Sequence, residues 1–176
     1  MTLNYICISD LHCGAENSLL TPNEGSKSEP VDLIKVIGTA LADLVKTIDP
    51  DANPDLILLG DAIDLSFSPP AIANAVLVGV LKSLFGSAES PHLCPFERVI
   101  FVPGNHDHEL WTAERFSKKS DAPQTFSYWS HTTPAFKAPE DMGTSNVLDE
   151  ALTLAGLSTP VHVYYPNFGL RNADHS

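Results

Sequence analysis

The stretch RVIFVPGNHDHELW, from Arg98 to Trp111, contains the pattern that decides the fold. Its apolar run at 99–102 is short and rich in β-branched residues, which predicts a buried strand. Pro103 and Gly104 end this strand, and four polar side chains follow in a row: Asn105, His106, Asp107 and His108. A buried strand that ends in adjacent ionisable side chains raises the question of what these side chains bind.

Two earlier segments end in the same way. Residues 3–9 (LNYICIS) and residues 55–59 (DLILL) are short, apolar and bounded by polar residues, so both are predicted strands. The side chains that follow them are Asp10 and His12 after the first strand, and Asp61 and Asp64 after the second.

Helices are predicted between these strands because apolar residues recur there at helical spacing. The predicted helices are 31–48, 71–85 and 146–157, and a further strand is predicted over 160–166. Alternating strands and helices predict an α/β fold with a mainly parallel sheet, whose strand ends meet at one edge. We interpret residues 1–176 as a single domain, with loop or cap insertions at 13–30 and 117–143.

The composition is that of a soluble globular protein, with 43% hydrophobic and 18% charged residues. The net charge of −12 does not favour nucleic acid as a partner. The N-terminus does not resemble a signal peptide, and no apolar segment is long enough to span a membrane. Three cysteines without metal-ligand or paired spacing favour a reducing environment, so a cytoplasmic location is expected.

The side chains at the strand ends are carboxylates, imidazoles and an amide, which together favour a divalent ion such as manganese, iron or zinc. A carboxylate that bridges two such ions, about 3.5–4 Å apart, would support in-line displacement at phosphorus. The sequence therefore predicts a metal site at this edge of the sheet.

The blocks DLH at 10–12, GDAID at 60–64 and GNHD at 104–107 resemble, in order, the first three signature blocks of the calcineurin-like metallophosphoesterases. The resemblance implies a four-layer sandwich of two β-sheets flanked by helices. It also implies hydrolysis of a phosphomonoester or phosphodiester by hydroxide bound at a dinuclear metal site. The implied partner is a phosphoester substrate.

The resemblance also implies a role for each residue of the three blocks. Asp10 and His12 would ligate one metal ion, Asp61 would bridge the two ions, and Asn105 would bind the second. His106 would be the catalytic residue, close to the phosphate and the leaving oxygen. Two further carboxylates would act behind these ligands: Asp107, by holding the His106 ring, and Asp64, as a structural or supporting group.

The family pattern normally continues with a further histidine and a G-H-x-H block, and no GH dipeptide occurs in this sequence. We therefore expect a C-terminally truncated domain. The alternative is a catalytically incompetent chain that acts as a metal-binding or interaction module, and a third hypothesis is a nuclease that acts on DNA ends. A truncated sheet would expose an edge strand, which predicts self-association into a homo-oligomer.

Overall fold

A four-stranded parallel sheet forms the centre of the protein in the computed structural model, which describes residues 2–87, 90–91, 96–110, 112, 146–159 and 161–164. The strands lie in the order β1 (Tyr5–Ile8), β2 (Asp55–Leu59), β5 (Val99–Val102) and β6 (Val161–Val163). Cys7 pairs with Ile57, which in turn pairs with Ile100. The carboxyl ends of all these strands therefore meet at one edge, and the predicted α/β fold is confirmed.

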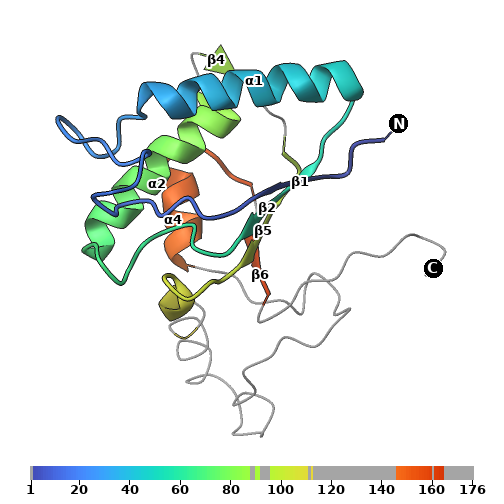
Figure 1. The fold of residues 1–176 in the computed structure, drawn as a ribbon. Coiled ribbons are helices and arrows are strands. Elements are labelled where there is room, and N and C mark those ends of the chain that lie inside the picture. The colour runs from blue at the N-terminus through green and yellow to red at the C-terminus, as the bar shows by residue number, and fades with distance from the viewer. Residues whose placement is uncertain are drawn as a thin grey trace, which may run out of the picture.

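The helices α1 (Asp32–Ile48), α2 (Pro70–Phe85) and α4 (Asn146–Leu154) lie on one side of this sheet (Figure 1). α2 is apolar on nearly every side and packs between α1 and α4. α1 approaches α2 closely at Gly38, where a Cβ atom would collide with the backbone carbonyl of Ser83. Each helix matches its predicted range to within a few residues at either end.

The central strands β2 and β5 are largely buried on both faces, which explains why they are almost continuously apolar, whereas β1 at the edge is partly exposed. On the helix-covered face, Leu56, Leu58 and Phe101 are almost fully buried. On the other face, Ile57, Ile100 and Val102 form a second buried cluster. A second full sheet, as in the expected four-layer sandwich, does not lie within the described residues, and that part of the expectation remains a prediction.

Local sequence explains where α2 begins and ends. Pro70 occupies its first turn, where a missing N–H costs nothing, and Gly86 ends it with a φ of 91° that favours glycine. An antiparallel pair, β3 (Gly86–Ser87) and β4 (Ser90–Pro91), follows, and the sequence did not predict it. The predicted insertion at 117–143 lies outside the described residues. No helix in the described part of the chain combines the length and apolarity needed to cross a membrane.

Candidate metal centre

The loops after β1 and β2 run side by side because the backbone hydrogen bonds of the sheet continue beyond the strands. The N–H of Asp10 donates to the carbonyl oxygen of Gly60 at 3.2 Å, and the N–H of His12 donates to that of Asp61 at 2.8 Å. A parallel bridge between Cys13 and Ile63 extends the pairing by another step. This backbone pairing brings the side chains of Asp10, His12 and Asp61 to the same place.

These three residues share a strained backbone conformation. Asp10, His12 and Asp61 have φ values of 55°, 45° and 51°, in the left-handed region that residues other than glycine adopt uncommonly, although asparagine, aspartate and histidine adopt it more often than the rest. Such a conformation costs up to about 1–2 kcal/mol for each residue and persists where the surrounding structure enforces it. All three residues with this conformation are predicted metal ligands. Backbone strain of this kind often occurs at functional sites.

The loop after β5 joins the same site through Asp61 and Gly104. The N–H of Gly60 donates to the carbonyl oxygen of Val102 at 2.7 Å, and the N–H of His106 donates to Oδ1 of Asp61 at 2.9 Å. A Cβ atom at Gly104 would collide with the carboxylate and backbone nitrogen of Asp61. Glycine is therefore required at this position to let the two loops approach.

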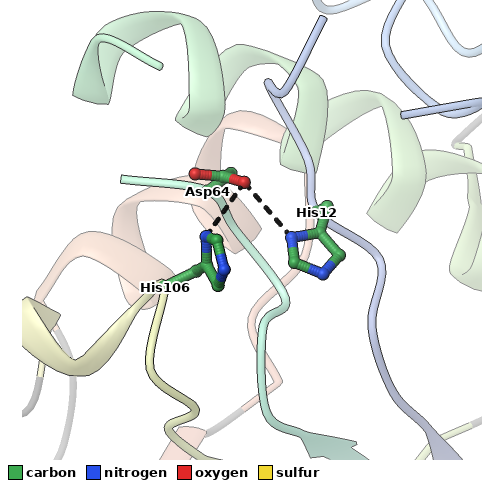
Figure 2. A group of neighbouring side chains, drawn as sticks. All are labelled: His12, Asp64 and His106. Carbon is green, nitrogen blue, oxygen red and sulfur yellow. Dashed lines mark hydrogen bonds and ion pairs between the residues drawn. The ribbon is translucent and has the colours of Figure 1, made fainter. Parts of the chain in front are cut away.

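A single carboxylate oxygen contacts both histidine rings of the site, as Figure 2 shows. Oδ2 of Asp64 lies 3.2 Å from Nδ1 of His12 and 3.2 Å from Nδ1 of His106. The His12 contact has hydrogen-bond geometry, whereas the His106 contact meets the distance of an ion pair without the direction of a hydrogen bond. The two rings meet edge to face, with their centroids 4.8 Å apart. Among the described residues, the second ring nitrogen of each histidine has no hydrogen-bond partner, so it can bind another group.

The other oxygen of Asp64 fixes the turn that leads to α2. Oδ1 accepts the N–H groups of Ser66 at 3.1 Å and Phe67 at 2.9 Å. Asp64 is 2% exposed, and burial alone would raise its pKa. Contacts with His106, the Phe67 backbone and His12 outweigh this effect and hold the pKa of Asp64 below its usual value. Asp64 therefore carries a negative charge beside two imidazoles, which keeps both rings in one orientation.

Asp107 differs from its predicted role. Its Oδ1 accepts the N–H of Gly104 at 2.6 Å, and its Oδ2 accepts those of Ala62 at 2.7 Å and Ile63 at 3.4 Å. The side chain is fully buried, and burial raises its pKa, an effect that its backbone partners oppose and the nearby charge of Asp61 reinforces. Asp107 thus ties the β2 and β5 loops together, and Asp64 occupies the position beside His106 that the sequence had assigned to Asp107.

The donor set fits a divalent cation. Two groups of side chains, His12 with Asp64 and His106, and Asp10 with His12 and Asp61, each place their ligand atoms within 4.8 Å of one another. Asn105 is exposed at the same loop end. Cys13 is buried, and burial raises the pKa of its thiol, so it remains protonated and offers no thiolate. Oxygen and imidazole ligands without thiolate suit manganese, iron or zinc.

A cavity of about 440 Å³ opens beside these side chains. Its lining includes Asp10, His12, Asp64 and His106, but not Asp61 or Asn105. It also includes four apolar side chains: Leu19, Leu20, Leu33 and Phe67. No sequence pattern singled out these four residues. Their position in the sequence could have pointed to them. The segment 13–30 directly follows the DLH block, and Phe67 follows the GDAID block.

The comparison with known families agrees with this geometry. The family model described as calcineurin-like phosphoesterase matches residues 3–163, and the chain therefore belongs to that family. Membership carries with it, in general terms, metal-dependent hydrolysis of phosphoesters. No curated protein and no solved structure matches the chain.

Proposed function

We propose that the chain hydrolyses a phosphomonoester or phosphodiester at a site that holds two divalent metal ions. The observation that supports this most strongly is the left-handed backbone of Asp10, His12 and Asp61, which aims a carboxylate, an imidazole and a second carboxylate at one point. In this proposal Asp10 and His12 hold one ion, Asp61 bridges to the other, and Asn105 contributes its amide oxygen to the second.

The ions, when bound, would supply a positive field for the phosphate and would lower the pKa of a water molecule, so that hydroxide is available as the nucleophile near neutral pH. Hydrolysis joins the water oxygen to phosphorus, breaks the bond from phosphorus to the alcohol oxygen and delivers a proton to that oxygen. His106 is the proposed proton donor, through the ring nitrogen that faces away from Asp64. Asp64 is a positioning residue in this proposal, because it holds Nδ1 of both His106 and His12.

The first experiment loads the protein with manganese, desalts it and measures metal content together with hydrolysis of bis(p-nitrophenyl) phosphate. We expect Asp61→Asn to lower metal content and to reduce hydrolysis by at least about 100-fold. Asp51→Asn is the matched control, since it removes the same charge from an exposed turn. Equal activity of the wild type and Asp61→Asn would contradict the proposal.

Asp64→Asn tests the positioning role. Replacing this carboxylate removes the charge that orients both rings, and we expect a loss of about 10–100-fold in kcat with a smaller change in KM. The pH profile of kcat should also shift, which loss of folding alone would not cause. An unchanged profile would exclude the positioning role.

The non-catalytic alternative has its own support. Each candidate ligand group in the described part of the chain contains three side chains, fewer than two complete metal sites need. One bound metal ion per chain, with no turnover in any variant, would favour this alternative.

A further inference from the structure

The cavity at the metal centre is lined by two chemically different kinds of side chain. Its polar lining includes the proposed ligands Asp10 and His12, and its apolar lining includes Leu19, Leu20, Leu33 and Phe67, which we call the apolar wall. A concave site with a few placed polar groups and a mainly apolar lining is the usual form of a small-molecule site. The apolar wall is therefore the part of this site that chooses among phosphoesters.

Three of the four residues of the apolar wall are exposed large hydrophobic side chains. Leu19 is 79% exposed, Phe67 76% and Leu33 43%. These residues come from different parts of the chain, the loop after β1, the start of α1 and the turn before α2, and they converge on one cavity. Exposed apolar side chains that gather beside a functional cavity mark a surface for an apolar group.

The two loops that carry the apolar wall are held in place by specific hydrogen bonds. The hydroxyl of Ser18 donates to the carbonyl oxygen of Leu11 at 3.0 Å and accepts the N–H of Leu20 at 3.2 Å. The backbone of Phe67 is bound by Asp64, and its ring centroid lies 5.7 Å from that of His106. A group resting on Phe67 would therefore lie next to the proposed proton donor without a loop having to order first.

Apart from the metal ions of the proposed function, the described residues that line the cavity add no lysine or arginine charge, which favours a substrate with few negative charges. The charged residues of this lining include Asp10 and Asp64. Proteins commonly hold the dianion of a phosphomonoester with arginine, whose planar fork matches the phosphate oxygens. A phosphodiester carries one negative charge and needs less of this support.

We infer that the substrate is a phosphodiester monoanion in which an aromatic or other apolar group is attached to an ester oxygen and rests on the apolar wall. This inference rests on the proposed function, since it names the substrate class of the same site. Phe67 and Leu19 are its specificity-determining residues, and they act on binding of the ester group rather than on the proton transfer.

The test measures binding to the manganese-loaded protein by calorimetry, without turnover. The probes are diphenyl phosphate, dimethyl phosphate and the monoester phenyl phosphate. We expect diphenyl phosphate to bind at least about 10-fold more tightly than dimethyl phosphate, and more tightly than phenyl phosphate. Phe67→Ala and Leu19→Ser should each reduce the preference for diphenyl phosphate over dimethyl phosphate to about 3-fold or less.

Leu44→Ser is the matched control, because Leu44 lies on α1 like Leu33 and is 53% exposed, but does not line the cavity. It should leave the preference unchanged. Equal binding of the diphenyl and dimethyl esters, or an equal preference in Phe67→Ala and the wild type, would overturn the inference. So would tighter binding of the monoester than of the diphenyl ester.

Hydrolysis of bis(p-nitrophenyl) phosphate by the same proteins separates the two proposals. If the wild type hydrolyses the ester, Asp61→Asn does not, and diphenyl phosphate binds no more tightly than dimethyl phosphate, the proposed function stands. The inferred substrate class is then wrong. A binding preference without turnover would remove the proposed function and leave the ligand class in place.

Discussion

The two ends of the central sheet treat buried negative charge differently. At the amino end, Asp55 begins β2 and is buried, and Arg98 contacts its Oδ2 through Nε and Nη2, both at 2.8 Å. At the carboxyl end, Asp64 and Asp107 are equally buried, but histidine rings and backbone N–H groups are their partners. In the described part of the chain, no lysine or arginine forms an ion pair there.

This contrast separates a structural carboxylate from a functional one. The chain neutralises Asp55 with its own cation, Arg98, so Asp55 needs no cation from solution. The carboxyl end combines several acidic groups with left-handed backbone, and no described lysine or arginine pairs with them, so its charge is suited to a cation from solution. Each of the following predictions tests one side of this difference.

The largest expected effect is stabilisation by metal at the carboxyl end. Manganese at about 100 times its Kd should raise the free energy of unfolding by about 2.7 kcal/mol, because only the folded chain assembles the ligands. Calorimetric melting with manganese and then with excess EDTA measures the rise in Tm and its reversal. Asp61→Asn should show little of this rise, and a rise equal to that of the wild type would contradict the site.

Gly104→Ala should destabilise the protein by about 2 kcal/mol, because the new Cβ would collide with Asp61. It should also reduce activity by displacing that carboxylate. Gly25→Ala is the control: its φ of 77° strains a side chain, but no atom lies within 4 Å, so we expect about 1 kcal/mol and unchanged activity. Chemical denaturation measures the free energy of unfolding of both variants. An equal loss of stability in the two would contradict the close approach of Asp61 to Gly104.

At the amino end, Arg98→Met should cost about 1.5 kcal/mol of stability, because it leaves Asp55 without its cation. The side chain of Arg98 is partly exposed, which limits the loss. Lys35→Met, which breaks the exposed pair with Asp32, should cost about 0.3 kcal/mol. Neither variant should change manganese content, and reduced metal binding in Arg98→Met would mean that the two ends are coupled.

The smallest expected effect concerns His162 on β6. Burial lowers its pKa, the charge of Arg98 acts in the same direction, and Asp55 opposes both. Because the folded protein binds this proton less readily than the unfolded chain, stability is full above pH of about 6.5 and falls as the pH drops toward the lowered pKa.

We expect a loss of less than about 1 kcal/mol between pH 7.5 and 5.5 from this residue. Urea unfolding of the wild type and His162→Gln across this range measures it. His162→Gln should show the shallower dependence on pH, and identical curves would exclude His162 as the source.

Sequence patterns predicted most of the fold and the edge of the sheet at which the candidate ligands lie. Apolar runs such as 55–59 and 99–102 are short and buried on both faces, so period and length identify them as strands. The parallel arrangement then implies that Asp10, Asp61 and His106 meet. The sequence implied only that these residues share one edge of the sheet. It could not predict their left-handed conformations, because these depend on hydrogen bonds between loops far apart in the sequence.

The division of labour between Asp64 and Asp107 could not be predicted. Both are aspartates in signature blocks, and the direction each side chain takes depends on which backbone N–H groups lie nearby after folding. The apolar wall escaped prediction for a similar reason, because Leu19 and Phe67 show no shared period and meet only in three dimensions. The β3–β4 pair was too short to produce a recognisable alternation.

The strand order β1-β2-β5-β6 has a consequence for how the protein is made. Each strand lies next to the strand that precedes it in this order along the chain, so the sheet grows at one edge as the polypeptide leaves the ribosome. Asp10 and Asp61 can meet once β1 and β2 have both emerged from the ribosome, whereas His106 waits for β5. A nascent chain would therefore acquire the start of a cation site before its proposed proton donor, and metal available during translation would favour the correct pairing of the first two strands.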